Sequence, residues 1–252
     1  MSSTLVCDLD GVVYLGETAV PGAGDALRRV EAHGWRVLFA TNNSARSPSH
    51  VVSKLQRVAG YHAVESQIIT SALVAASLVE VGPVLVMAES GVVEALAETG
   101  FALTEDPSAA ATVVVGLDRG ISYERIHRAS EAVRGGARLV VTNRDPTYPT
   151  DRGLLPGAGA CAAPVEMASG VRGVTAGKPS DAMRAFIEGR SSDGPIWMVG
   201  DRPDTDIALA VGARWRSVLV TTGVTEEGER PQFEPDVIAA DLPSAVDGLV
   251  RR

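Results

Sequence analysis

The sequence has few cysteines and a shortage of basic residues, and each shortage excludes a class of protein. Only two of its 252 residues are cysteines, Cys7 and Cys161, which excludes a disulfide framework and a zinc site built from cysteines. Its 31 acidic residues outnumber the 23 basic ones, so the net charge is −8. That balance argues against a nucleic-acid-binding protein, which needs a basic face. It does not exclude an anionic substrate, since a bound metal ion can invert the local electrostatic field.

Long apolar runs are also absent. No apolar stretch approaches the roughly 20 residues that a helix needs to span a bilayer, so we expect no membrane segment. The first ten residues carry no basic stretch and already include two acids, so we expect no signal peptide and a cytoplasmic location. Internal repeats and low-complexity linkers are missing as well, so any domain boundary has to come from the spacing of motifs.

Short apolar runs alternate with helix-length amphipathic segments along the whole chain. This alternation predicts an α/β protein with a parallel sheet that is buried on both faces. The expected strands are Thr4–Cys7, Arg36–Ala40, Val84–Met87, Ala111–Val115, Arg138–Val141, Val174–Ala176, Ile196–Val199, Ser217–Val220 and Val237–Ile238. The expected helices include Gly24–Ala32, Ser49–Ala59, Val92–Thr99, Tyr123–Val133, Ser180–Ile187 and Ile207–Val211.

Acidic residues directly follow the first expected strand. Asp8 and Asp10 come after Thr4–Cys7, and Gly11 follows them. In an open α/β sheet, ligands bind beyond the carboxyl ends of the strands, so both carboxylates should reach that crevice. Two like charges there repel one another and favour a bound cation. Taken alone, the pair also fits an ordinary turn or a helix cap.

Short hydrogen-bond donors follow the second expected strand. Thr41 and Asn42 begin a polar segment that continues to Ser44. Hydroxyl, amide and backbone N–H groups at a strand end are suited to binding phosphate oxygens. A polar turn before the helix that begins near Pro48 explains the same residues without any ligand.

Two further strand ends carry charge. Lys178 follows an apolar run, and a lysine is a point charge well suited to a phosphoryl group, although most single lysines are solvated surface residues. Asp201, Asp204 and Asp206 follow the next expected strand, three acids within six residues. Such a cluster is typical of a site where oxygen ligands hold a hard cation.

The ordered combination is more specific than its parts. Four strand ends carry, in turn, a carboxylate pair, a hydroxyl and amide turn, a lysine and an acidic cluster. Over nearly the whole chain, this set resembles the haloacid dehalogenase-like superfamily of phosphohydrolases. The stretches DLDGVVYLG, ATNNSARS, TNRDPTYPTDRGLLPGAGA, AGKPS and GDRPDTDI look like its NagD-like, p-nitrophenylphosphatase-like subfamily.

The resemblance implies a magnesium-dependent phosphatase that works through an aspartyl-phosphate intermediate. Asp8 matches the family's nucleophile, and Asp10 matches its general acid and base. The implied Mg²⁺ ligands are the Asp8 carboxylate, the main-chain carbonyl of Asp10 and the Asp201 carboxylate. Asp206 would act through a water or through a hydrogen bond to a ligand. Asp204 receives no direct role.

Phosphate binding is assigned from the same resemblance. Thr41, Asn42 and Lys178 match the groups that stabilise the oxygens of the transferring phosphoryl group. The implied substrate is a small phosphorylated metabolite. Phosphoglycolate, glycerol phosphate, sugar phosphates and nucleoside monophosphates all stay open.

The spacing of the motifs places an inserted cap. Only 31 positions separate Asp10 from Thr41, whereas 137 separate Thr41 from Lys178. A minimal crossover needs about a dozen residues, so the surplus holds strands and helices of its own. With the resemblance, this predicts a Rossmann-like parallel-sheet core with an inserted α/β cap that selects the substrate. The core is residues 1–78 and 168–252, and the cap is residues 79–167. Subfamily members often dimerise through this cap, and no apolar stripe in the sequence decides whether this chain does.

Within the cap, the polar segment Thr142–Gly153 contains prolines and is interpreted as a loop. It resembles the family loop that faces the active site and selects the substrate. Arg144 could pair with a substrate carboxylate or a second phosphate, although an exposed loop cation is the plainer interpretation. The candidates to contact a leaving group are Asn143, Arg144, Asp145 and Thr147.

Other functions share parts of the pattern. A receiver domain also surrounds a phosphoaspartate with acids, Ser or Thr, and Lys, but it is about half this size and needs no cap. A dehalogenase has no use for the acid that Asp10 supplies, and a phosphomutase usually carries its cap between the first two motifs, where the gap is too short. A non-catalytic binding protein stays open. The segment Gly157–Ala162 matches a dinucleotide-binding glycine pattern, but it follows Pro156 rather than a clear strand, so we discount nucleotide binding there.

Overall fold

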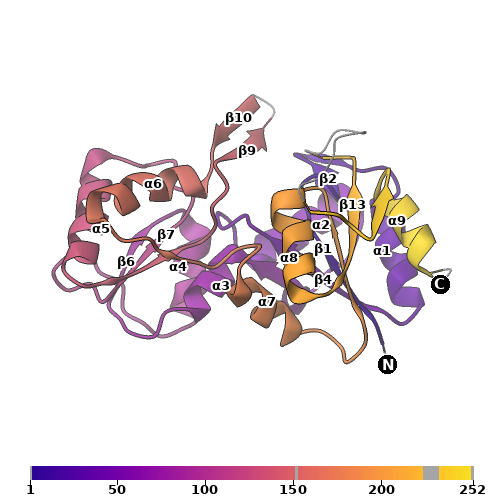
Figure 1. Ribbon diagram of the computed structural model, residues 1–252, viewed down its shortest axis with the longest axis horizontal. Helices are drawn as coiled ribbons and strands as arrows, with labels where there is room; N and C mark the ends of the chain where they lie inside the picture. The colour runs from indigo at the N-terminus through magenta and orange to yellow at the C-terminus, as the bar shows by residue number, and fades with distance from the viewer. Residues whose placement is uncertain (1, 151–152, 224–232, 251–252) are drawn as a thin grey trace. The chain divides into compact units, whose positions relative to one another are not determined.

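The computed structural model describes residues 2–150, 153–223 and 233–250. The chain divides into two compact units (Figure 1). The first unit consists of Met1–Thr41, Pro48–Ile69 and Arg184–Arg252, and the second of Asn42–Ser47 and Thr70–Met183. The second unit therefore contains residues 79–167, interpreted as a cap, together with the segment that directly follows Thr41.

The first unit is built on a parallel sheet with the strand order β14–β13–β12–β1–β4–β5. Its strands are β1 (Thr4–Cys7), β4 (Arg36–Thr41), β5 (Ile68–Thr70), β12 (Ile196–Gly200), β13 (Arg216–Val220) and β14 (Val237–Ala239). β1 lies in the middle and pairs in parallel with β12 on one side and β4 on the other. All four residues of β1 are buried, as expected for a strand that is covered on both faces.

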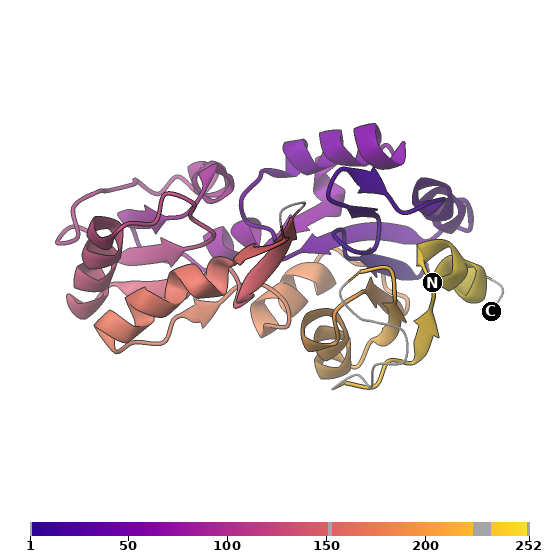
Figure 2. The same cartoon turned by 90° about the horizontal axis from the view of Figure 1, so that it is seen from above.

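Helices of the first unit bury one apolar stripe each. In α1 (Ala23–Ala32), the buried residues Ala26, Leu27 and Val30 fall on one side of the helix. This helix packs against α9 (Leu242–Val250), and the two lie side by side in Figure 2. The remaining elements are the hairpin of β2 (Tyr14–Leu15) and β3 (Thr18–Ala19), α2 (Pro48–Ala59), the 3₁₀ turn η1 (Glu65–Gln67), the π-helical turn η2 (Pro203–Ile207) and α8 (Ala208–Ala213). Helix α7 (Asp181–Glu188) belongs partly to each unit.

The second unit has its own parallel sheet, in the order β11–β8–β7–β6. Its strands are β6 (Val84–Met87), β7 (Thr112–Val115), β8 (Arg138–Val141) and β11 (Val174–Thr175). The helices are α3 (Ser71–Ser77), α4 (Ser90–Ala97), α5 (Tyr123–Arg134) and α6 (Ala158–Ser169). α3 packs against α4, and α5 packs against α6. In the described part of the chain, no helix combines the length and the apolar character needed to cross a bilayer.

The predicted fold class is confirmed, since both sheets are parallel and alternate with helices. Every expected strand is present with its ends within one residue. The interpretation of Thr142–Gly153 as a loop is wrong, because β9 (Thr147–Thr150) pairs with β10 (Gly153–Pro156) in an antiparallel hairpin. Pro149 lies opposite Leu154 in this hairpin. A two-stranded ribbon has only edge strands, and an edge strand tolerates a proline that cannot donate a hydrogen bond.

Candidate active site

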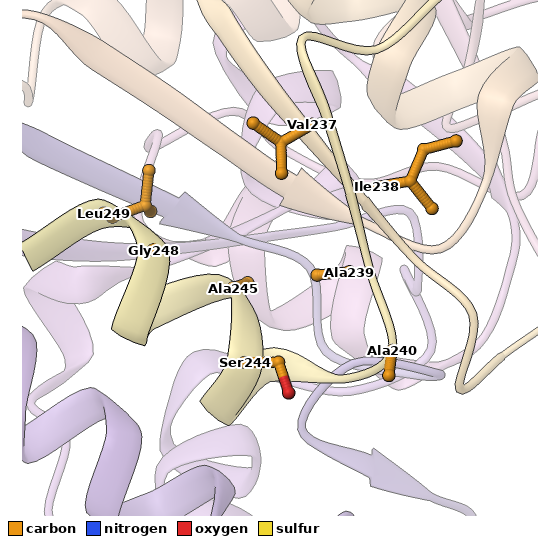
Figure 3. A pocket seen from close by; sticks show the side chains of 8 residues that line it. All are labelled: Val237, Ile238, Ala239, Ala240, Ser244, Ala245, Gly248 and Leu249. Carbon is orange, nitrogen blue, oxygen red and sulfur yellow. The ribbon is translucent and has the colours of Figure 1, made fainter.

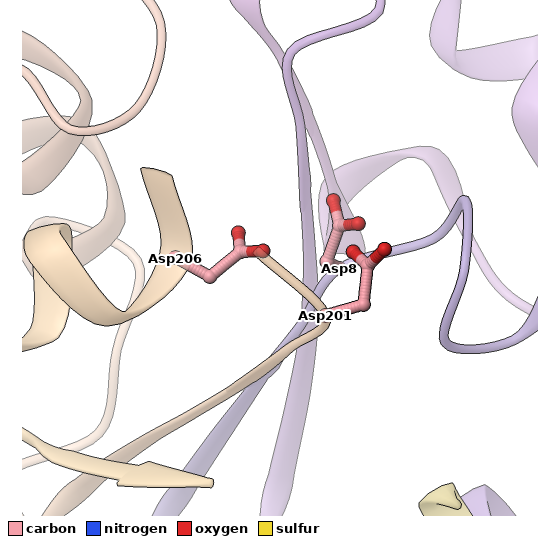
Figure 4. Close-up of side chains that lie close together, drawn as sticks. All are labelled: Asp8, Asp201 and Asp206. Atoms are coloured by element: carbon pink, nitrogen blue, oxygen red, sulfur yellow. The ribbon is translucent and has the colours of Figure 1, made fainter. Parts of the chain in front are cut away.

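Three of the acidic residues predicted at the site lie together in the first unit (Figure 4). Asp8 follows β1, Asp201 follows β12, and Asp206 lies in η2. A carboxylate oxygen from each lies within 4.8 Å of one from each of the others. Their exposed fractions are 7%, 1% and 1%. Because β1 and β12 are adjacent parallel strands, their carboxyl ends meet at one edge of the sheet and bring Asp8 and Asp201 together.

Glycines make room for these carboxylates. A Cβ atom on Gly11 would lie 2.4 Å from Asp201 Oδ2, and one on Gly223 would lie 1.9 Å from the same oxygen. A Cβ on Gly200 would lie 2.2 Å from the Cβ of Asp206. Gly11 also has φ +91, a conformation that other residues rarely adopt. The close packing of the acids therefore depends on residues without side chains.

The chemistry of this donor set fits a divalent cation. Three buried carboxylates at this separation repel one another, and the repulsion is relieved when a cation lies between them. Carboxylate oxygens are the ligands that Mg²⁺ and Ca²⁺ prefer in proteins. Asp8, Asp201 and Asp206 therefore form a candidate magnesium site.

Asp10 lies two residues beyond Asp8 and is more exposed. Its backbone forms a β-bridge with Tyr14, and the N–H of Gly11 donates to the Tyr14 carbonyl at 2.8 Å. Burial raises the pKa of the Tyr14 phenol, and the charges of Asp10 and Asp8 raise this pKa further, so the ring stays neutral. The ammonium of Lys54 lies 3.9 Å from Asp10 Oδ1. Sequence patterns had not singled out Lys54.

Thr41 is the last residue of β4 and is buried. Strand β4 is the direct neighbour of β1, so the Thr41 backbone emerges at the same sheet edge as Asp8. The first unit therefore gathers Asp8, Asp10, Thr41, Asp201 and Asp206 at the carboxyl ends of three adjacent strands and in the turn that follows.

Asn42 and Lys178 are joined within the second unit. The backbone N–H of Lys178 donates to Asn42 Oδ1 at 2.8 Å, and Asn42 Nδ2 donates to the Lys178 carbonyl at 3.2 Å. Asn42 Nδ2 also lies 3.2 Å from the Asp145 carboxylate. The Asn42 carbonyl accepts from Asn143 Nδ2 and from Ser71 Oγ, both at 2.6 Å. Asn42 and Lys178, which are far apart in the sequence, are thus joined by hydrogen bonds in a buried position.

Arg144 is engaged inside the second unit. Its guanidinium donates to the Glu166 carboxylate at 2.8 Å, to Thr175 Oγ1 at 2.9 Å and to the Gly173 carbonyl at 2.7 Å. Burial alone would raise the pKa of the Glu166 carboxyl, but hydrogen bonds from Arg144 and from the Gly173 N–H outweigh it and lower this pKa. These contacts favour a structural role for Arg144 over contact with a substrate.

The glycine pattern after β10 has a structural explanation. A Cβ on Gly157 would lie 2.3 Å from the Asp145 carbonyl oxygen, and one on Gly159 would lie 2.4 Å from that of Arg144. The glycines therefore let the start of α6 pack directly on the backbone of residues 144 and 145. Thr147, the last of the predicted cap contacts, begins β9 and pairs with Pro156.

An apolar pocket of about 310 Å³ lies between β14 and α9 (Figure 3). None of the predicted site residues lines it, and the Ser244 hydroxyl is its single polar side-chain group. Without an acid, a base or a cation, this pocket offers no chemistry.

Comparison with known proteins gives the same family over both halves of the chain. A haloacid dehalogenase-like hydrolase profile matches residues 5–102, and a HAD-hydrolase-like profile matches residues 175–245. An acid sugar phosphatase of Staphylococcus saprophyticus is 36% identical over 250 residues, which cover 96% of each chain. A 5′-nucleotidase of Bacillus subtilis is 36% identical over 251 residues, 94% of this chain and 96% of that one.

A solved structure supports the same family. The glycerol phosphate phosphatase of Mycobacterium tuberculosis, solved in complex with magnesium, superposes with a TM-score of 0.85 at 35% identity. The match covers 96% of this chain and 75% of that one. Since these likenesses extend over almost the entire sequence, the chain belongs to the haloacid dehalogenase-like hydrolase family, in its NagD-like, p-nitrophenylphosphatase-like subfamily.

Proposed function

We propose that this phosphoric monoester hydrolase is a magnesium-dependent phosphatase that acts on small phosphorylated metabolites through an aspartyl-phosphate on Asp8. The observation that carries the proposal is the group of three buried carboxylates whose oxygens lie within 4.8 Å of one another at the sheet edge. A structural turn has no need of such a costly arrangement of charge.

The residues that would hold Mg²⁺ are Asp8 and Asp201 through their carboxylates and Asp10 through its main-chain carbonyl. Asp206 would bind through a water or through a hydrogen bond to a ligand. A bound Mg²⁺ would neutralise the clustered carboxylates and the charge of the phosphoryl group. That neutralisation lets an anionic nucleophile approach an anionic substrate.

Two displacements make up the proposed reaction. In the first, a carboxylate oxygen of Asp8 attacks phosphorus, and the ester P–O bond breaks with its electron pair passing to the leaving oxygen. Asp10 donates its proton to that oxygen. In the second, Asp10 takes a proton from water as the water oxygen attacks phosphorus. The bond between phosphorus and Asp8 then breaks, its electrons return to the carboxylate, and phosphate is released.

Thr41, Asn42 and Lys178 are proposed to bind the remaining phosphoryl oxygens. A hydroxyl, an amide and an ammonium aimed at these oxygens stabilise the charge that spreads over them in the transition state. The mutual hydrogen bonds of Asn42 and Lys178 support this role, because they fix the backbone of Lys178 against the Asn42 side chain and so place the two residues next to one another.

The substrate is proposed from the relatives. They are named for activity on sugar phosphates, nucleotides and glycerol phosphate, so we propose a compound of this size, with the second unit acting as a cap that selects it. Dimerisation through the cap stays a prediction, which sedimentation of the purified protein would test.

The test is phosphate release from p-nitrophenyl phosphate, phosphoglycolate, glycerol phosphate, sugar phosphates and nucleoside monophosphates, each with magnesium and with EDTA. We expect turnover that needs magnesium, and a loss of at least about 10³-fold in kcat for Asp8→Asn. Absence of turnover with every ester, from folded protein that binds magnesium in calorimetry, would overturn the proposal in favour of a binding or regulatory role.

A further inference from the structure

A second lysine lies beside the candidate active site. The chain contains only two lysines, Lys54 and Lys178, among its 23 basic residues. Lys178 belongs to the proposed phosphate site. Lys54 lies on α2, and its ammonium is 3.9 Å from Asp10 Oδ1 and 3.8 Å from the centroid of the Tyr14 ring.

The environment holds the Lys54 ammonium in place. Its side chain is only 18% exposed, so it does not behave as a freely solvated surface lysine. The face of the buried, neutral Tyr14 ring attracts the cation. Tyr14 is in turn connected to the backbone of Asp10 by the β-bridge. The ring, the ammonium and the carboxylate therefore form a local set within the first unit.

The Asp10 side chain is less enclosed than the other acids of the site. It is 43% exposed, whereas Asp8, Asp201 and Asp206 are buried and closely packed. Packing alone therefore does not determine the direction of the Asp10 carboxylate. A compact ammonium above a fixed ring can attract one carboxylate oxygen and so restrict the rotation of the other. A general acid works only when its oxygen is within hydrogen-bond reach of the leaving group.

We infer that Lys54 is a positioning residue that orients Asp10 toward the leaving oxygen of the substrate. The inference rests on the proposed function, because it assigns Lys54 a part in the first displacement. It acts through Asp10 and has no contact of its own with the reacting atoms. Its loss should therefore matter most where the leaving group depends on the proton of Asp10.

The test compares kcat/KM, which reports the first displacement, for glycerol phosphate and p-nitrophenyl phosphate at saturating magnesium. The p-nitrophenolate ion can leave without being protonated, whereas the alkoxide of glycerol needs a proton in order to leave. Lys54→Met keeps an unbranched side chain and removes the charge. We expect it to lower kcat/KM about tenfold for glycerol phosphate and less than about threefold for p-nitrophenyl phosphate. Lys54→Arg, which restores a cation, should recover most of the loss.

The matched control is Arg57→Met, one turn further along α2. Arg57 is exposed and pairs with Glu17, so its removal deletes the same charge away from Asp10 and should leave both substrates unaffected. If Lys54→Met lowers both kcat/KM values by the same factor, or if Lys54→Arg recovers nothing, the role of Lys54 as a positioning residue is overturned while the proposed function stands. A wild-type protein without turnover on either ester overturns both.

Discussion

The two units are built on the same plan and use it differently. Each has a parallel sheet with polar residues after the carboxyl ends of its strands. In the first unit, Asp8 and Asp201 leave adjacent strands and come together with Asp206 as buried like charges. In the second unit, Asn143 and Arg144 follow β8, and their side chains donate hydrogen bonds to groups of the same unit.

This contrast distinguishes a candidate binding site from a network of hydrogen bonds that stabilises the fold. Buried carboxylates placed this close together repel one another, and a bound cation relieves that repulsion, which marks the carboxyl end of the first sheet as a candidate binding site. Satisfied hydrogen bonds rigidify a loop but leave fewer groups available for a ligand. The carboxyl ends of the strands in a parallel sheet can thus carry either a binding site or a purely structural network, depending on which residues follow the strands.

The largest expected effect comes from the acidic cluster. Asp201→Asn should lower kcat by about 10³-fold, because it weakens both the metal site and the transition state that depends on it. Without divalent metal, the free energy of unfolding should rise by about 1 kcal/mol, because one of three mutually repelling carboxylates is gone. Phosphate release with magnesium present measures kcat. Urea unfolding in EDTA measures the free energy of unfolding without metal. The control Asp204→Asn changes an exposed acid paired with Arg202. If Asp201→Asn markedly lowers the stability of the metal-free protein, the acids of the first unit would be structural, like the polar network of the second unit.

A smaller effect is expected at the point where the chain enters the second unit. Asn42→Ala removes the side-chain hydrogen bonds to Lys178 and should lower kcat/KM by about 10²-fold, since a misplaced phosphate ligand stabilises the transition state poorly. Steady-state kinetics on p-nitrophenyl phosphate measure it. Asn43→Ala, at the exposed neighbouring position, serves as the control. Unchanged kinetics in Asn42→Ala would show that the hydrogen bonds between Asn42 and Lys178 have a structural role only.

The packing of α6 in the second unit should affect stability and spare chemistry. A methyl group on Gly159 would lie 2.4 Å from the Arg144 carbonyl oxygen, so Gly159→Ala should lower the free energy of unfolding by about 2 kcal/mol. Gly212 of α8 has open space around it, and Gly212→Ala should instead raise stability by about 0.5 kcal/mol. Urea denaturation compares the two variants. Equal effects would show that the close approach at Gly159 is not restrictive.

A smaller loss of stability than that of Gly159→Ala is expected when the ion pair of Arg144 is removed. Glu166→Gln should lower stability by about 1 kcal/mol at pH 7 and leave kcat unchanged. The pKa of Glu166 is lowered below its ordinary value of 4.5, so the wild-type advantage is fully present above that pH and fades as the pH falls through the lowered pKa. Unfolding curves at pH 7 and at pH 3 measure this. A tenfold fall in kcat would instead assign the Arg144 network to the active site.

Much of the architecture was predictable because strong local patterns agree with the fold. Buried parallel strands are near-continuous apolar runs, so β1 and β12 stand out in the sequence, and the acids that follow them must share an edge. The hairpin of β9 and β10 was missed because both four-residue strands contain a proline and β9 is largely polar, so only their mutual pairing makes them strands. Lys54 was missed because helix α2 brings it to Asp10, and no spacing between positions 10 and 54 signals that contact.

The sequence by itself determined the alternation of strands and helices, the order of the four motifs and the residue types at each strand end. These follow from periodicity and side-chain chemistry, which act over a few residues. Only the tertiary structure decided that β11 joins the sheet of the second unit, that Asn42 and Lys178 share hydrogen bonds, and that Arg144 pairs with Glu166. Each of these depends on the free energy of contacts between segments far apart in the chain, and local pattern carries no record of it.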